Sequence, residues 1–300
     1  MKTSLCLLND RIIAVCGREQ KSGVFVTAYR SLELSEGSII NGVATDFSEV
    51  EASLKKLKDD AYMKLKNVTL ILDSSLIFMR QAVIPITGKR KTSLIISNEF
   101  SDIETGEKNL LKDFSILNKN MREKNASVLC YAAEKELIGS YIGLFKKAEI
   151  SLSKIDISTS CIIKYAKRIQ ALRGKTYVVS VIGENAAVLY LFVKNQYFYS
   201  TRARLLSEPF SDDFYQEISA KLSSMLQFFK SQHSGFDISD VYLCGLDDSQ
   251  AAKCAFYIND LGIAVSSSAI FDGIISRRKN LNTFSGSDYL YNIGSFLKDR

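Results

Sequence analysis

The stretch TYVVSVIGENAAVLYLFVKNQYFYSTRA, residues 176–203, contains three short apolar runs separated by polar turns. Runs of β-branched and aromatic residues with turn residues between them predict an antiparallel three-strand meander. Residues 3–30 show the same pattern. A helical pattern and another apolar run follow both meanders. The order of three strands, a helix and a strand over 3–73 is therefore repeated over 176–244. The chain therefore contains one α/β unit twice.

Two similar α/β halves usually leave a cleft between them, and this is the layout of the actin-like ATPases, the sugar kinases and the heat-shock ATPases. A small unit interrupts the first half. Its predicted order over 86–156 is helix, strand, strand, helix, which is typical of a compact α+β insert. The sequence therefore predicts an α/β fold of the actin-like (ribonuclease-H-like) class, with two similar halves around a cleft and a small inserted α+β subdomain.

The expected domain limits follow these patterns. They are a first half over 1–85, the insert over 86–156, a helix over 157–174 that returns to the first half, a second half over 175–272, and a loop with a C-terminal helix over 273–300 that packs on the first half.

Apolar residues spaced three and four apart predict the helices. The first helix is expected over about 49–66, after a crossover over 31–46 in which two glycines make turns and Asp46 or Ser48 caps the helix. The last helix is expected over about 288–299, after a polar, loop-like stretch.

The composition is that of an ordinary globular protein with 300 residues, 46% hydrophobic content and a net charge of +6. The positive charge is spread over lysines that are typical of solvated helix faces, among them Lys55, Lys56, Lys58, Lys64 and Lys66. A nucleic-acid groove needs a denser basic patch, so no nucleic-acid partner is expected, while an anionic membrane surface or an acidic partner stays open. No run of about twenty apolar residues predicts a membrane-spanning helix.

The cysteines and the histidine exclude two kinds of site. The six cysteines form no CxxC pair and have apolar neighbours, which is typical of buried, reduced thiols in a cytosolic protein. The single histidine, His233, lies in a polar stretch where a surface position is expected. Because zinc sites and His-based triads need more such residues, no metal site is expected.

Four segments resemble one family, in the order in which that family has them. They are LSEGSIINGVATD at 34–46, NVTLILDSSLIFMRQAVIP at 67–85, SVLCYAAEKELIGSYIGLFKKAEISLSKIDI at 127–157 and YNIGSFLKDR at 291–300. The family is PilM, the cytoplasmic actin-like component of the type IV pilus inner-membrane platform. The matching segments are spread over nearly the whole chain.

The resemblance implies a cytoplasmic scaffold, peripheral at the inner face of the plasma membrane, in a pilus or a related secretion system. In that family the protein holds the short cytoplasmic N-terminal tail of a membrane-anchored partner, PilN, in a groove near the insert, so membrane association would be indirect. Phe78 and Arg80 are the candidate partner contacts here. A structural alternative, with Phe78 in the core and Arg80 as a solvated strand residue, stays open, as does a homo-oligomer.

An actin-like ATPase needs two loops that present backbone N–H groups to phosphates, with carboxylates for Mg²⁺, and a later glycine-rich turn that admits adenosine. The first loop here contains Asp10 but no glycine. The second keeps Gly183, but Val181 stands where the family has an aspartate, and Glu184 lies on the other side of the glycine. The third keeps Gly245 but lacks the usual second glycine.

These departures predict a pseudo-ATPase rather than an enzyme. Asp10, Gly183, Glu184 and Gly245 are named as remnants of the nucleotide site, and no catalytic residue is assigned. No Gly-x-x-x-x-Gly-Lys-Ser/Thr loop occurs in the chain. A valine in place of a carboxylate removes charge that balances Mg²⁺, so no cofactor is expected, although weak binding of ATP with Mg²⁺ stays open.

Two other functions stay open. An active actin-like ATPase or small-molecule kinase would draw its carboxylates from Asp10, Asp73 or Glu184, although an aspartate that opens a DSS turn is more often a turn cap. An FtsA-like cell-division protein would end in an amphipathic membrane helix, whereas the last segment, 287–300, is short and mixed in polarity.

Overall fold

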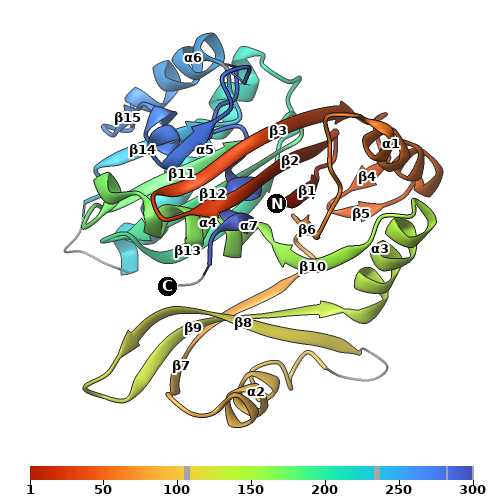
Figure 1. The fold of residues 1–300 in the computed structure, drawn as a ribbon. Coiled ribbons are helices and arrows are strands. Elements are labelled where there is room, and N and C mark those ends of the chain that lie inside the picture. Colours follow the sequence, from red (N-terminus) through yellow and green to blue (C-terminus); the bar gives the residue numbers. More distant parts are fainter. Residues whose placement is uncertain (105–108, 233–236, 282, 299–300) are drawn as a thin grey trace. The chain divides into compact units, whose positions relative to one another are not determined.

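The computed structural model describes residues 1–300 except 105–108, 233–236, 282 and 299–300, and Figure 1 shows its elements along the chain. His233, expected at the surface, lies outside the described residues. The chain divides into two compact units. Unit 1 consists of Met1–Gly17, Ala28–Ser160 and Ser295–Arg300, and unit 2 of Arg18–Thr27 and Cys161–Gly294. The domain limits expected from the sequence stay predictions.

Five strands of a six-stranded sheet have the order β10-β6-β1-β2-β3, and apart from their residues within Arg18–Thr27 they belong to unit 1. These strands are β1 (Lys2–Leu7), β2 (Arg11–Gln20), β3 (Gly23–Glu33), β6 (Val68–Leu72) and β10 (Leu152–Ile157). β1 runs antiparallel to β2, whereas β1, β6 and β10 are parallel. Every residue of β6 is buried, as a continuous apolar strand inside a sheet requires. The predicted N-terminal meander and the strand after it are confirmed.

Helix α1 (Phe47–Asp59) contacts helix α3 (Lys135–Lys147) in unit 1. The carboxylate of Asp46 caps α1 by accepting the Glu49 N–H at 3.0 Å, as predicted. The predicted end of this helix at residue 66 is wrong. The Asp60 carboxylate accepts the Tyr62 N–H at 2.7 Å and Arg30 Nε–H at 2.6 Å, and these two bonds hold a turn in place of further helix.

The crossover over 31–46 contains a two-stranded hairpin that the sequence reading missed. β4 (Ile39–Ile40) and β5 (Val43–Ala44) flank Asn41 and Gly42, which have φ angles of 52° and 73°. A Cβ atom on Gly42 would lie 2.6 Å from the Cβ of Ser74, so only glycine fits. The Tyr141 hydroxyl of α3 donates to the Gly42 carbonyl at 2.8 Å and ties the hairpin to that helix.

The insert is a three-stranded antiparallel sheet with one helix on it. The strands have the order β7-β9-β8, and the elements are β7 (Phe78–Pro85), α2 (Lys89–Asn98), β8 (Leu110–Asn120) and β9 (Asn125–Glu134). Its own small core consists of Ile84, Ile96, Phe100, Leu110, Ala126, Val128, Cys130 and Ala132. The predicted order of helix, strand, strand and helix is confirmed, and β7 adds a third strand from the preceding segment.

Unit 2 has a sheet of order β13-β12-β11-β14-β15. Its strands are β11 (Tyr177–Ile182), β12 (Ala186–Val193), β13 (Gln196–Arg204), β14 (Asp240–Cys244) and β15 (Ala264–Ser266). The helices that follow Ile157 are α4 (Ser158–Arg168), η1 (Gln170–Leu172), α5 (Asp212–Gln232), α6 (Asp248–Asn259), η2 (Ser268–Ile274) and α7 (Leu290–Phe296). β11 is antiparallel to β12 and parallel to β14.

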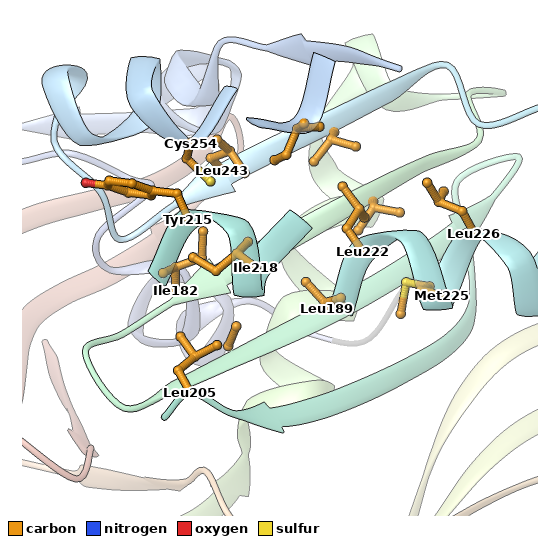
Figure 2. Packing of buried hydrophobic residues seen from close by; sticks show 14 of the residues in the cluster. Ile182, Leu189, Leu205, Tyr215, Ile218, Leu222, Met225, Leu226, Leu243 and Cys254 are labelled. Carbon is orange, nitrogen blue, oxygen red and sulfur yellow. The ribbon is translucent and has the colours of Figure 1, made fainter. Parts of the chain in front are cut away.

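The core of unit 2 lies between this sheet and the long helix α5. Figure 2 shows Ile218, Leu222 and Met225 of α5 in one cluster with Leu189 of β12 and Leu243 of β14. These side chains are almost fully buried. The apolar stripe of α5 follows from spacings of three and four residues, which place one helix face on the sheet.

The polar stretch before the C-terminal helix is more ordered than predicted. β16 (Ile275–Arg277) pairs in parallel with the start of β3, with Ile275 opposite Val24. The last helix, α7, is shorter than expected. Gly294 in α7 lies against α4, because a Cβ atom there would lie 2.0 Å from the Cys161 carbonyl oxygen.

The internal repeat is confirmed. The order β3-β2-β1-β6-β10 of the first half matches β13-β12-β11-β14-β15 of the second. The pairs β2-β1, β1-β6 and β6-β10 have the same antiparallel or parallel direction as their counterparts β12-β11, β11-β14 and β14-β15. The six cysteines are buried and form no disulfide, as expected. In the described ranges, no helix combines the length and apolar character that a bilayer crossing requires.

Candidate functional site

The first nucleotide loop predicted from the sequence is a closed turn in unit 1. The Leu8 N–H donates to the Arg11 carbonyl at 2.9 Å and closes a turn that has only Asn9 and Asp10 between these two residues. The Asp10 carboxylate accepts from Arg11 Nε at 2.7 Å and is therefore already paired. The Asp10 carbonyl accepts the Leu34 N–H at 2.8 Å. The Asp10 carboxylate and the Leu8 N–H therefore both bond to Arg11 within the turn.

The other three predicted nucleotide residues come together in unit 2. β11 and β14 are parallel neighbours, so the turn at Gly183 and Glu184 follows one strand while Gly245 follows the other. Gly245 has a φ of 85°, and a Cβ atom there would lie 2.3 Å from the Ile182 carbonyl oxygen. The Gly183 N–H donates to the Ala186 carbonyl at 2.9 Å. This turn, like the first loop, is closed by its own backbone.

The helix start after Gly245 is also closed. Asp247 caps α6, its carboxylate accepting the Gln250 N–H at 2.8 Å while the Gln250 side chain accepts the Asp247 N–H at 3.0 Å. This reciprocal capping satisfies the N–H groups of Asp247 and Gln250 at the start of the helix. It also places a carboxylate where a phosphate would otherwise be attracted by those groups.

The carboxylates at the ends of the unit 1 strands have partners too. Asp73, at the end of β6, accepts the Ser158 hydroxyl at 2.8 Å. Asp156, buried in β10, pairs with Lys154 at 2.6 Å and accepts the Ile157 N–H at 3.0 Å. Across the residues that the structure describes, no three His, Cys, Asp or Glu side chains gather as a metal site would need.

The two residues predicted to contact a partner lie on the inner face of β7. Phe78 is half-buried against the core of the insert. The Arg80 guanidinium donates to both carboxylate oxygens of Asp102 at 2.8 and 2.7 Å and lies over the Phe100 ring at 5.6 Å. The hydrogen bond from Arg80 lowers the pKa of the Asp102 carboxyl. Both side chains have intramolecular packing roles, and a partner contact by either stays a prediction.

A pocket of about 650 Å³ in unit 1 is the feature that the sequence reading missed. It lies where the last turns of α3 meet β10. The residues that line it are Ile142, Phe145, Lys146, Glu149, Ile150, Ser151, Leu152, Ser153, Lys154 and Ile155. Half of these residues are aliphatic or aromatic, and most of the exposed surface of the pocket is apolar, while the lysines, the glutamate and the serines add polar atoms. We call it the α3–β10 pocket.

The α3–β10 pocket adjoins an open sheet edge. Within the described part of the chain, β10 ends the sheet order and pairs only with β6. Its other edge therefore presents backbone N–H and C=O groups outward. One sequence signal pointed here. Ile142 is apolar but lies off the buried face of α3 that Tyr141, Leu144 and Phe145 form, and it is 51% exposed.

The polar groups of the pocket are held by the neighbouring helix. Lys58 of α1 donates to the Glu149 carboxylate at 2.5 Å, and this hydrogen bond lowers the pKa of Glu149. Lys146 and Lys154 add positive charge beside the apolar lining. The arrangement can take an extended apolar segment along β10 with polar groups at its margin.

Comparisons with known proteins define the fold. No family model and no curated protein sequence matches the chain. Among solved structures, a chain of the PilM-PilN type IV pilus biogenesis complex has a TM-score of 0.81 and 14% identity, covering 98% of this chain and 96% of that one. A Bacteroides thetaiotaomicron protein with an actin-like ATPase fold and unknown function has a TM-score of 0.49 and 14% identity over 91% of this chain and 94% of its own.

The match to the chain of the PilM-PilN complex confirms the fold class. This chain shares the fold of that chain and has two similar α/β halves and a small insert. The resemblance to PilM is confirmed at the level of the fold, across nearly the full length of both chains.

Proposed function

We propose that this protein is a cytoplasmic PilM-type scaffold of a type IV pilus, or a related secretion platform, that binds the cytoplasmic tail of a PilN-like membrane protein. The observation that carries the proposal is the fold match over 98% of this chain to a chain from a complex of PilM with PilN. In this proposal the partner holds the protein at the inner face of the plasma membrane.

The α3–β10 pocket is the proposed place for the tail. Its volume of about 650 Å³ is in the usual range of ligand pockets, and its lining is mostly apolar. β10 offers six residues of edge strand, which can pair with a short extended peptide through backbone hydrogen bonds. Side chains of such a peptide alternate in direction, so every second one would enter the pocket.

A peptide titration tests the proposed tail site. The N-terminal cytoplasmic peptide of a PilN-like membrane protein is titrated by calorimetry. We expect Ile142→Asp to weaken binding by about tenfold or more, because it places a charge in the apolar lining. Leu94→Asp is the matched control, since Leu94 is a similarly exposed apolar residue of helix α2 that does not line the pocket.

Two other outcomes would contradict the proposed tail site. If Ile142→Asp binds like the parent protein while Phe78→Ala and Met79→Asp lose binding, the tail lies along β7 instead. If the parent protein does not bind the peptide at all, the proposed partner is wrong.

We also propose that ATP hydrolysis is lost. The turns at Leu8–Arg11 and Gly183–Ala186 are closed by their own hydrogen bonds, and the α6 start has an aspartate cap. The N–H groups of Leu8, Gly183 and Gln250 therefore donate within the protein, whereas the phosphate-binding loops of actin-like proteins present free N–H groups. A calorimetric titration with Mg²⁺-ATP and a phosphate-release assay test this. Sub-micromolar binding with turnover would restore the alternative of an active ATPase.

A further inference from the structure

A group of lysines surrounds one end of the unit 1 sheet, where β1, β6 and β10 begin. We call this group the basic edge, and its members are Lys55, Lys56, Lys58, Lys64, Lys66, Lys146 and Lys147. The first three belong to the last turns of α1, the next two to the segment before β6, and the last two to the end of α3. All seven are exposed.

Contacts within unit 1 bring these three segments to the same end of the sheet. The Thr3 hydroxyl, at the start of β1, donates to the Lys64 carbonyl at 2.6 Å. In the parallel register, Val68 at the start of β6 lies beside both Thr3 and Leu152, the first residue of β10. The ion pair of Lys58 with Glu149 joins the ends of α1 and α3.

The carboxylates nearby leave much of this positive charge uncompensated. Segments 55–66 and 146–149 contain seven lysines and three acidic residues. Asp60 is paired with Arg30, and Glu149 with Lys58. Lys55 forms a further ion pair with Glu51. No ion pair of the described residues involves the other five lysines, which are Lys56, Lys64, Lys66, Lys146 and Lys147.

Helix chemistry accounts for only part of the basic edge. Lysines in the last turns of α1 and α3 complement the negative ends of the helix dipoles. Lys64 and Lys66 lie outside any helix, so the dipole does not explain them. Between the helix end and Lys64, Tyr62 is 71% exposed and its ring lies 5.4 Å from the Arg30 guanidinium. An exposed tyrosine among lysines is typical of surfaces that touch phospholipid headgroups.

We propose that the basic edge binds the anionic surface of a phospholipid bilayer directly. The charge of the exposed lysines complements acidic headgroups, and Tyr62 can insert at headgroup level. This adds a lipid contact to the partner-mediated attachment. Lys146 and Glu149 lie at the basic edge and also in the wall of the α3–β10 pocket, so a membrane-anchored tail in that pocket would keep the edge near the bilayer. The position of the basic edge beside a bound tail rests on the proposed function, whereas the lipid contact itself does not.

A vesicle flotation assay without any partner peptide tests the lipid contact. We expect the protein to float with vesicles containing phosphatidylglycerol, and not with phosphatidylcholine alone, and the binding to weaken with added salt. The triple variant Lys56→Gln, Lys64→Gln and Lys66→Gln should reduce partitioning about a hundredfold, from about fivefold for each lysine near the surface.

A second triple variant provides the matched control. Lys230→Gln, Lys253→Gln and Lys279→Gln remove the same charge from exposed positions of unit 2 and should leave vesicle binding nearly unchanged. Equal losses in the two variants, or no binding by the parent protein, would overturn the proposal. Tighter binding to duplex DNA at the same salt concentration, lost in the first variant only, would also overturn it. Because no tail is present, these outcomes are independent of the peptide titration.

Discussion

The two halves of the fold share a strand order but differ most in the connection to the last strand of each sheet. In the second half, the chain passes from β14 to β15 through the single helix α6. In the first half, the equivalent step from β6 to β10 contains β7, α2, β8, β9 and α3. The enlarged connection brings the insert, and it ends on the helix that forms one wall of the α3–β10 pocket.

The edge strands that follow these connections also differ. β15 has three residues, whereas β10 has six. Short edge strands offer little backbone to a passing chain, and proteins use them to avoid unwanted pairing. The longer open edge of β10, beside an apolar pocket, offers more backbone groups for pairing with another chain. The comparison shows that the shared strand order is kept for packing in both halves. The connection before the last strand, and the length of that strand, can differ and so can serve binding.

The largest expected effect tests whether the two cores are equivalent. Leu54 of α1 and Leu222 of α5 are both fully buried in their own half. Leu54→Ala and Leu222→Ala should each lower the free energy of unfolding by about 2–5 kcal/mol, through lost burial and the cavity left behind. Chemical denaturation followed by circular dichroism measures this. Leu94→Ala at an exposed position is the control, and a negligible loss in one half only would break the equivalence.

The repeated cores could be predicted from the sequence because their signals are local. Buried strands such as β6 and β12 are continuous apolar runs, and α5 has an apolar stripe at helical spacing. The Asn41-Gly42 pair is a hairpin signal of the same local kind, and it could have revealed β4 and β5. The end of α1 could not be found in this way, because Arg30 and Asp60 meet only in the folded chain.

The second prediction compares glycines with the same backbone angle in the two halves. Gly37 has a φ of 84° with open space around it, whereas Gly245 has a φ of 85°, and a Cβ atom added to it would lie 2.3 Å from the Ile182 carbonyl oxygen. Gly37→Ala should cost about 1–2 kcal/mol for the left-handed conformation alone. Gly245→Ala should cost about 3 kcal/mol, since the clash adds to that strain. Thermal and urea unfolding measure both, and equal costs would mean that the third turn is not held against β11.

The candidate sites were harder to predict than the fold, for a physical reason. The glycines at 183 and 245 could be named from their order along the chain, but the hydrogen bonds that close the loops depend on geometry. The α3–β10 pocket depends on two elements meeting at a sheet edge. Arg80 was named as a partner contact because its segment resembles the PilM family, and its bond with Asp102 involves a residue after α2.

The third prediction concerns the insert, which the second half lacks. The hydrogen bond from Arg80 lowers the pKa of Asp102 in the folded protein. A carboxyl with a lowered folded-state pKa stabilises the protein above its ordinary pKa, and this contribution is lost as the pH falls through the folded value. Thermal melts from neutral pH down to about pH 3 should therefore show a steeper acid loss for the parent protein than for Asp102→Asn. Parallel curves would show that the pair does not stabilise the insert.

The smallest expected effect separates charge from packing where α3 meets the rest of unit 1. Lys58 and Glu149 form an exposed pair, so Lys58→Gln should leave the urea midpoint unchanged, because solvent screens such pairs. Tyr141→Phe is the comparison. It removes a buried hydrogen bond to the Gly42 carbonyl and should cost about 1 kcal/mol. A clear drop with Lys58→Gln would mean that the basic edge itself holds α1 to α3. An unchanged midpoint would leave its lysines free for an anionic surface.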